Sequence, residues 1–327
     1  MRFKISAGLW CTNNFSDRYV LSGYFNELSL KEQLEIFSEI EGLDGLGIIY
    51  PTYPLPNEPD KLIKYLSEFN LKVADISVDN YSDRKWKNGA FCTNEKNIRK
   101  ENMKLCKEAI DFAAEMPGSK VMLWPAHDGM DYPFQVNYED GWENIVESYR
   151  ELCDYNKNVI LAIEYKSKDP RQRQYISNVG KMLLLMNDVG MENLTGCIDS
   201  GHALMCQESL AETVMLLHMH NKLGIVHLND NYRDSDPDLI FGTIAFWDNL
   251  EMFYYLKKIN FSGWNEIDIT SPREDRKKSM KLVVKMVRKY EELAEKLIMH
   301  SKEIDLNLKN YRFTDNMNLI IDILFGK

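Results

Sequence analysis

The stretch that decides the fold begins with residues 159–164, which read Val-Ile-Leu-Ala-Ile-Glu. Residues 195–199 then read Thr-Gly-Cys-Ile-Asp, residues 224–229 read Gly-Ile-Val-His-Leu-Asn, and residues 265–270 read Asn-Glu-Ile-Asp-Ile-Thr. Each run is a short apolar segment of the kind typical of a buried β-strand. Each also carries a carboxylate or an imidazole near its end, which is unusual among otherwise apolar residues. The spacing between the runs leaves room for one helix after each strand.

The same alternation of strand and helix extends over the rest of the chain. Apolar strands separated by single helices pair in parallel through right-handed crossovers, and eight such units close into a (β/α)8 TIM barrel. The predicted strands are Phe3–Trp10, Leu46–Tyr50, Lys72–Val78, Lys120–Trp124, Val159–Glu164, Thr195–Asp199, Gly224–Asn229 and Asn265–Thr270. The predicted helices include Leu30–Glu41, Pro59–Phe69, Asn94–Glu115, Asp140–Asn156, Val179–Asp188, Leu210–Lys222 and Trp247–Ile259.

An open doubly wound sheet is the rival architecture, and it would predict a glycine-rich phosphate turn after the first strand. The glycine cluster of this chain, Gly42-Leu-Asp-Gly-Leu-Gly47, instead precedes a strand and indicates a helix stop and a turn. We therefore expect residues 1–302 to form one barrel. We expect a C-terminal helical extension, and we expect the apolar segment Met317–Phe325 of residues 303–327 to pack on the barrel or on another subunit.

Composition and charge limit the functional class. The chain has 327 residues, of which 44% are hydrophobic and 28% are charged, so it can bury a large core. Its net charge of −10 argues against nucleic acid as a partner, because clustered basic residues bind phosphate backbones. No apolar run reaches the ~20 residues of a membrane span, so no membrane partner is expected. Six cysteines without a CxxC pair, and a first segment without a signal-peptide pattern, favour a cytoplasmic protein.

Four residues at consecutive strand ends form the first candidate metal site: Glu164, Asp199, His227 and Asp268. In a barrel, the C-terminal strand ends share one mouth, where active sites are built. Ionised groups inside a barrel are costly unless they are paired or bind a metal. Three carboxylates and one imidazole make a hard, anionic ligand set that suits Mn2+ best, with Mg2+, Co2+ and Zn2+ as alternatives. A single strand-end carboxylate is usually a helix cap or an ion-pair partner, but four on adjacent strands favour a metal.

A second candidate ion site lies just beyond these strand ends. His202 follows Asp199 by three residues, and Asp236 and Asp238 have the alternate spacing that lets two carboxylates meet one ion. Taken alone, residues 234–238 would indicate an acidic, solvated loop with a turn at its proline. The presence of His202 favours the second ion instead.

Six more residues are candidates for catalysis or substrate binding. Lys166 has the strand parity of Glu164, so its ammonium could hold a substrate oxygen in the mouth; the alternative is a surface lysine. His127 could shuttle a proton, because its unperturbed pKa lies near neutrality; the alternative is a structural histidine. Glu266 shares the inward face of its strand with Asp268 and could act as a base or support a ligand. The expected substrate-binding residues are Trp124, Asp128 and Arg273.

These motifs resemble those of a known family. Glu164-Tyr-Lys166, followed by Asp-Pro-Arg171, is similar to the Glu-Tyr-Lys segment of L-rhamnose isomerases and their relatives, which belong to the xylose isomerase-like barrel superfamily. Asp199-Ser-Gly-His202 resembles the family's Asp-x-Gly-His motif. His227-Leu-Asn-Asp, with the later Asp-Pro-Asp-Leu, resembles its His-x-Asn-Asp and Asp-Asp-Asp-Leu run. The segment that begins at Asp268 resembles the eighth strand of bacterial sugar isomerase relatives.

The resemblance covers about residues 120–277 and implies one divalent ion on the four strand-end residues. It also implies a second, more mobile ion near His202, Asp236 and Asp238. Two features depart from the family's pattern. Pro237 replaces a middle acidic residue, and no histidine occurs before His127, so a family base on an early strand has no match here.

We expect a divalent-metal-dependent sugar isomerase that interconverts aldoses and ketoses by proton or hydride transfer. Its partners would be a small carbohydrate and further copies of the chain. A ketose 3-epimerase is an alternative, although relatives of that kind carry Glu where this chain has Asp268. A metal-dependent lyase resembling the C-glycoside deglycosidases would act on keto-sugar glycosides with a small partner subunit. A DNA-repair enzyme resembling the AP endonucleases would need a basic mouth and more histidine ligands than a chain with six histidines offers.

The acidic composition generates a first prediction. At about 0.15 M salt, the chain should not bind abasic DNA usefully, because a net charge of −10 repels the phosphate backbone. An electrophoretic mobility shift assay on duplexes with and without an abasic site measures this. A retarded band at sub-micromolar protein would favour the repair enzyme over the isomerase.

Overall fold

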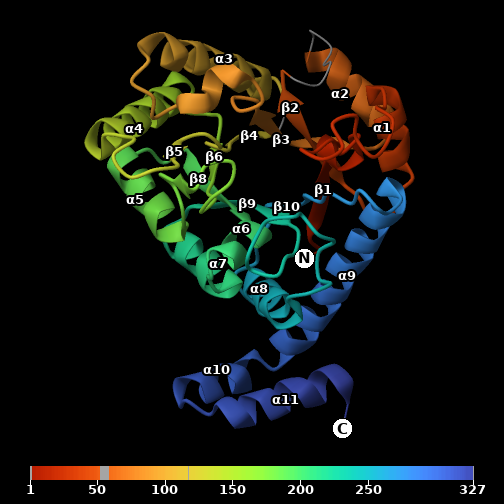
Figure 1. Cartoon of the computed structure of the whole chain (residues 1–327). Coiled ribbons are helices and arrows are strands. Elements are labelled where there is room, and N and C mark those ends of the chain that lie inside the picture. The colour runs from red at the N-terminus through yellow and green to blue at the C-terminus, as the bar shows by residue number, and fades with distance from the viewer. Residues whose placement is uncertain (1, 52–58, 117, 327) are drawn as a thin grey trace.

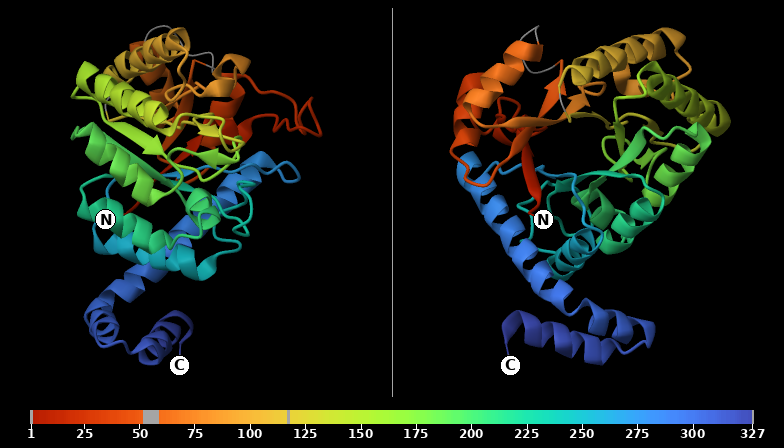
Figure 2. Two further views of the ribbon diagram at one scale, coloured as in Figure 1. Left: turned by 60° about the vertical axis from the view of Figure 1, so that its left-hand side comes forward. Right: turned by 180° about the vertical axis from the view of Figure 1, so that it is seen from behind.

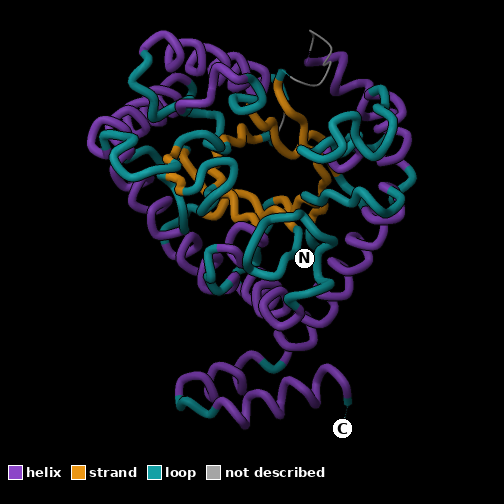
Figure 3. Tube along the Cα trace, in the orientation of Figure 1, coloured by secondary structure: helices purple, strands orange, loops and turns teal. Residues whose placement is uncertain are grey.

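The computed structural model describes residues 2–51, 59–116 and 118–326 of the chain. Eight parallel strands close into one barrel in the order β1-β10-β9-β8-β6-β4-β3-β2, which confirms the predicted fold. Figure 1 and Figure 3 show this ring of strands surrounded by helices. The barrel strands are β1 (Lys4–Gly8), β2 (Gly45–Tyr50), β3 (Lys72–Val78), β4 (Lys120–Leu123), β6 (Leu161–Glu164), β8 (Leu194–Asp199), β9 (Leu223–Leu228) and β10 (Trp264–Ile267).

Helices follow the barrel strands and cover the outside of the ring. Local sequence sets their ends: Ser29 and Glu32 form a reciprocal capping box at the start of α1, and Gly190 ends α5 at φ 70°. The predicted strands and helices agree with the observed elements to within three residues at either end. The helices around the barrel are α1 (Leu30–Ser38), α2 (Pro59–Glu68), α3 (Lys96–Ala114), α4 (Tyr138–Tyr155), α5 (Val179–Val189), α6 (Ser200–Met205), α7 (Leu210–Met219), α8 (Phe246–Lys258) and α9 (Arg276–Met299), with 3-10 turns η1 (Leu9–Thr12) and η2 (Arg84–Asn88).

A small antiparallel ribbon ties two loops together at the mouth of the barrel. β5 (Gly129–Met130) follows β4 and pairs with β7 (Arg173–Gln174), which follows β6. An ion pair of 2.7 Å between Asp131 Oδ2 and Arg171 Nη1 holds the same two loops. Sequence analysis did not predict this ribbon, because strands of two residues carry no usable periodicity.

The chain continues beyond the barrel into α10 (Ser301–Lys309) and α11 (Phe313–Phe325), which confirms the predicted C-terminal helical extension. Figure 1 and Figure 2 show these two helices side by side, apart from the ring of strands. An apolar hollow of about 470 Å³ lies between them and α8. Tyr311, Phe313 and Phe325 are exposed on this helix pair. Packing of residues 303–327 on another subunit stays a prediction.

Among the described helices, none combines the length and the hydropathy that a transmembrane span requires.

The barrel interior is filled by side chains in layers. Alternate residues of each strand point inward, so polar and apolar layers follow one another along the barrel axis. At the N-terminal end of the strands, the Lys120 ammonium donates a hydrogen bond to the carbonyl of Gly224. The small apolar cluster in the interior consists of Met122, Ala162, Cys197 and Ile225.

The position of Lys120 predicts a pH dependence of stability. Burial lowers the pKa of its ammonium from 10.5 to about 8. Between pH 8 and 10.5 the unfolded chain therefore binds more protons than the folded protein, so stability rises with pH in this window. Below about pH 8, Lys120 is charged in the folded protein as well. Burial of that charge opposes folding, so the stability gained at higher pH is lost.

Urea unfolding from pH 7.5 to 10.5 measures the effect by comparing the wild type with Lys120→Met. Between pH 7.5 and 10.5, the free energy of unfolding of the wild type should rise by about 1–3 kcal/mol more than that of the variant. Lys72→Met, which removes an exposed lysine at the start of β3, is the control and should follow the wild type. Parallel pH profiles for the wild type and Lys120→Met would contradict the prediction.

Candidate active site at the mouth of the barrel

Four polar side chains meet where β6, β8, β9 and β10 end. Strand pairing places Asp199 directly beside His227, so neighbouring strands deliver inward-facing groups to one region. His227 Nδ1 lies 3.2 Å from Glu164 Oε1 and 3.4 Å from Asp268 Oδ2. One donor atom from each of the four residues lies within 4.8 Å of the others. The structure thus brings together the four residues that the sequence nominated as the first metal site.

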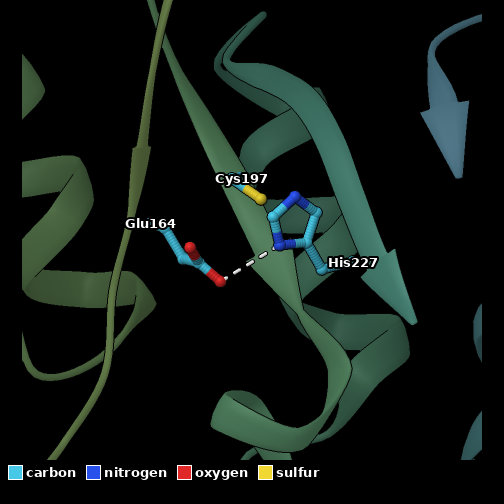
Figure 4. A group of neighbouring side chains, drawn as sticks. All are labelled: Glu164, Cys197 and His227. Carbon is cyan, nitrogen blue, oxygen red and sulfur yellow. Dashed lines mark ion pairs between the residues drawn. The ribbon is translucent and has the colours of Figure 1, made fainter. Parts of the chain in front are cut away.

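Two of these residues are buried without the hydrogen bonds that buried polar atoms normally form. Glu164 Oε1 and both ring nitrogens of His227 have no hydrogen-bond partner among the described residues. Figure 4 shows the carboxylate and the imidazole facing each other, with the sulfur of Cys197 beside them. Burial raises the pKa of the Cys197 thiol above its usual value, so this sulfur is a neutral neighbour. A divalent cation would satisfy the open oxygen and nitrogen atoms, so the donor set fits the predicted metal.

A second group adjoins the first through Asp199. This residue caps α6, because its Oδ1 accepts the backbone N–H of His202 at 2.8 Å, and its Oδ2 accepts the Asn229 amide at 2.7 Å. His202 Nε2 lies 3.0 Å from Asp236 Oδ2. Donor atoms of Asp199, His202 and Asp236 all lie within 4.8 Å of one another, as a second ion site requires.

The two groups concentrate negative charge in a buried site. Burial alone would lower the pKa of His202. The carboxylates of Asp199 and Asp236 outweigh this effect and raise the pKa to about 10. The imidazole is therefore charged in the metal-free protein, and it can serve as a ligand only after losing this proton. Burial raises the pKa of Asp199 to about 7. Asp238 lies outside the second group but lines the same cavity, where burial and then Asp236 raise its pKa well above the usual value.

Lys166 is a buried ammonium at the edge of this site. Its Nζ lies 2.9 Å from Asp236 Oδ2 and 5.1 Å from the centroid of the Trp124 ring. Burial alone would lower the pKa of Lys166, but the carboxylates of Asp236 and Asp238 raise it above the usual value. The side chain therefore stays charged although it is almost completely buried.

A cavity of about 350 Å³ opens over these side chains. This volume lies in the range of sites that bind small molecules. Its polar lining comes mainly from the ends of β6 to β10 and also from Asn13, Ser77, Asp79 and Ser82, and the rest of the lining is aromatic or apolar. Trp10 links the two parts, because its Nε1 donates to Asp268 Oδ1 while its ring contributes to the apolar part. The apolar part consists of Trp10, Ile49, Met122 and Trp124.

The family model for the xylose isomerase-like TIM barrel matches residues 23–295. The chain belongs to this xylose isomerase-like family. A xylose isomerase from Thermus thermophilus is 26% identical over 272 residues, which are 77% of this chain and 68% of the relative. A xylose isomerase from Thermus caldophilus is 25% identical over 218 residues, which are 62% of this chain and 56% of that relative.

The structure of an L-ribulose 3-epimerase shares the fold, with a TM-score of 0.73 and 15% sequence identity. The alignment covers 92% of this chain and 98% of that chain. The named relatives are an epimerase and isomerases of sugars. They confirm the predictions that the chain belongs to the xylose isomerase-like superfamily and that it is an enzyme.

The predicted site residues His127 and Arg273 of this xylose isomerase-like barrel lie outside the cavity lining, as do Asp128, Asp199 and Glu266. His127 is half-buried, and its Nε2 lies 3.0 Å from the Tyr81 carbonyl oxygen. Arg273 is exposed on the loop after β10. Neither is among the described residues that line the cavity, so the proton shuttle and the substrate contact that we predicted for them stay predictions.

Asp128 does not face the cavity, contrary to the sequence prediction of a substrate contact. Its carboxylate is buried and accepts the backbone N–H groups of Ala90, Phe91 and Cys92. Hydrogen bonds from backbone amides to a buried carboxylate hold a loop in place. Asp128 therefore organises the segment between η2 and α3.

Glu266 is also shielded from the cavity, which argues against the predicted role as a base. Its Oε2 accepts the Ser6 hydroxyl at 2.7 Å, and its Oε1 lies 3.8 Å from His227 Nε2, on the interior side of the ring. Burial and then the charge of Asp75 raise the pKa of Glu266 well above its usual value. This geometry favours the second role predicted for Glu266, in which it supports a residue that binds the metal.

Sequence analysis missed Asp75 and Trp10. Asp75 lies in β3, fully buried, with its Oδ2 3.7 Å from His227 Nε2. A carboxylate in the middle of an otherwise apolar strand was the signal that could have revealed it. Trp10 lies in η1, and a single tryptophan near a strand end cannot be told from a core residue by its sequence context.

Proposed function

We propose that this chain is a divalent-metal-dependent sugar isomerase that interconverts an aldose and a ketose. The observation that carries the proposal is the convergence of Glu164, Asp199, His227 and Asp268 at one point, where Glu164 Oε1 and His227 Nδ1 are buried without a hydrogen bond from the described residues. The second group, with His202 and Asp236, adjoins this point and supports the same chemistry. The Thermus xylose isomerases among the relatives support it as well.

The first group would hold one ion, with Mn2+ as the preferred metal, and the second group would hold another. When bound, such an ion supplies Lewis-acid polarisation to the carbonyl and hydroxyl oxygens of the sugar. The oxygen-rich donor set favours Mn2+ or Mg2+ over softer metals. Asp199 would serve both groups, since it belongs to each.

The chain's own residues would bind and orient the sugar. Lys166 Nζ is charged and lines the cavity, so it can donate a hydrogen bond to a substrate oxygen on which negative charge develops. The rings of Trp10 and Trp124 offer an apolar surface to the carbon skeleton of the sugar. The same rings limit the access of water to the carbons that exchange hydrogen.

The charges of the cavity favour a neutral sugar over a phosphorylated one. The lysine that lines the cavity is Lys166, and its ammonium already forms an ion pair with Asp236. A phosphate group would add negative charge to a cavity that is rich in carboxylates. The carboxylates of the lining are Asp79, Glu164, Asp236, Asp238 and Asp268.

One assay tests this proposal against its nearest alternative. A panel of aldoses and ketoses, together with their phosphates, is incubated with protein and Mn2+, and the products are identified by NMR. Isomerisation moves the carbonyl group between carbons, whereas 3-epimerisation inverts only carbon 3. Turnover of sugar phosphates alone would contradict the inferred substrate class, and no turnover of any sugar would count against the function.

The ligand arrangement predicts about one tightly bound divalent ion per chain. Asp199→Asn should lose this ion, because an amide lacks the charge but can still cap α6 and preserve the fold. Metal analysis by mass spectrometry measures the content, and the melting temperature reports folding. Asp234→Ala, which removes an exposed carboxylate from the neighbouring loop, is the control and should keep the ion. Full occupancy in folded Asp199→Asn would refute the assignment.

Lys166→Met should lower turnover by about 10²–10³-fold, because one preorganised donor to a developing charge is typically worth that much. The substitution keeps the length of the stem, so metal content should change little, whereas the melting temperature should fall because the buried Asp236 carboxylate loses its partner. Steady-state kinetics on the sugar that the panel identifies gives kcat and KM separately.

Lys168→Met is the control for Lys166→Met, because Lys168 is exposed and its Nζ donates to the Asp234 carbonyl. Its kinetics should match those of the wild type. Unchanged kcat in Lys166→Met would show that the lysine has no part in the reaction. Loss of metal or of folding would show that its role is structural.

A further inference from the structure

A pair of carboxylates lies in the barrel interior, next to His227. Asp75 of β3 and Glu266 of β10 are fully buried, and their oxygens lie with His227 Nε2 within 4.8 Å of one another. Nε2 is 3.7 Å from Asp75 Oδ2 and 3.8 Å from Glu266 Oε1. Neither carboxylate is among the described residues that line the mouth cavity, so neither is placed to touch a substrate.

Two small residues make room for this pair. A Cβ at Gly47 of β2 would lie 2.3 Å from Glu266 Oε1 and 2.7 Å from Asp75 Oδ1, so any side chain there would displace both carboxylates. Ser6 of β1 pairs in register with Glu266, and its hydroxyl donates to Oε2 at 2.7 Å. The residues of β1 and β2 thus accommodate the carboxylates of β3 and β10.

The imidazole of His227 therefore lies between two pairs of carboxylates. Its Nδ1 faces Glu164 and Asp268 on the mouth side, while its Nε2 faces the interior pair. A neutral imidazole carries one N–H, and only the other nitrogen has a lone pair for a metal. Asp75 Oδ1, Asp75 Oδ2 and Glu266 Oε1 form no hydrogen bond with the described residues, so acceptors for that N–H are available.

We propose that Asp75 and Glu266 are positioning residues that accept the Nε2–H of His227 and so orient the ring with the lone pair of Nδ1 toward an ion at the mouth. This deepens the proposed function and rests on it for what Nδ1 binds. The separations of 3.7 and 3.8 Å exceed hydrogen-bond length, and a ring shift of less than about 1 Å closes either one. A carboxylate that accepts the second N–H of a ligating imidazole fixes its orientation and strengthens it as a ligand.

The test compares the wild type with Asp75→Asn and Glu266→Gln. These substitutions keep the shape of each side chain, but an amide can donate to Nε2, whereas an ionised carboxylate only accepts. The first readout is the dissociation constant for Mn2+, measured by competition with a chelator. The second is the ¹⁵N NMR shift of His227 Nε2 in protein loaded with diamagnetic Mg2+, assigned with His227→Asn.

Each variant should bind Mn2+ about 10–100-fold more weakly, and its Nε2 resonance should move away from the wild-type position because the carboxylate acceptor is lost. Glu291→Gln is the matched control, since Glu291 is a buried carboxylate on α9 that pairs with Lys257 and Arg288. Its melting temperature should fall, but its Mn2+ affinity and the His227 Nε2 resonance should stay unchanged.

Wild-type Mn2+ affinity in both variants would overturn the proposal, and so would an unchanged Nε2 resonance. If the wild type binds no divalent ion, the proposed function fails and this inference fails with it, whereas an ion that binds equally well to the wild type and both variants overturns this inference alone. If both variants fail to fold, Ser6→Ala removes only the hydroxyl that anchors Glu266. Wild-type affinity and an unchanged Nε2 resonance in Ser6→Ala would then contradict the role of the pair.

Discussion

Closure of eight parallel strands into one ring fixes where every inward-facing side chain lies. In a closed barrel each strand is hydrogen-bonded to two neighbours, so no strand can slip without breaking two ladders. The register places Asp199 beside His227, His227 beside Glu266, and Glu266 beside Ser6. A slip by one residue would turn each of these groups to the outer face of the barrel. Backbone pairing therefore sets where the side chains of the site begin, and neighbouring side chains then orient them.

The main consequence of this arrangement is electrostatic. The mouth gathers carboxylates into a buried space in which Lys166 and the charged His202 offset part of the negative charge. Buried charges of one sign oppose folding unless cations compensate for them, so a site of this kind is poorly explained by stability alone. The buried atoms of Glu164 and His227 that form no hydrogen bond with the described residues indicate where a cation would bind. The charge balance thus points to the same conclusion as the ligand geometry.

The cavity has a polar part and an apolar part, and together they limit the substrates and reactions that the site suits. Carboxylates and imidazoles on one side suit metal-assisted hydrogen transfer on a sugar, and the rings of Trp10 and Trp124 on the other side suit its carbon skeleton. A repair enzyme would need a basic surface to hold a phosphate backbone, whereas this lining is rich in carboxylates. A lyase of the deglycosidase type could use the same polar part, and its small partner subunit would distinguish it from an isomerase.

The sequence by itself determined the order of strands and helices, the closed barrel and the strand-end residues Glu164, Asp199, His227 and Asp268. These follow from periodicity and from polar residues at the ends of apolar runs, which are local properties of the chain. Only the tertiary structure decided that Asp128 turns away from the cavity toward the amides of residues 90–92, and that Asp75 and Glu266 lie on the interior side of His227. Those placements depend on the register between strands far apart in the chain and on depth within the barrel. A pattern of residue types carries no information about either, because depth and register arise only when the ring closes.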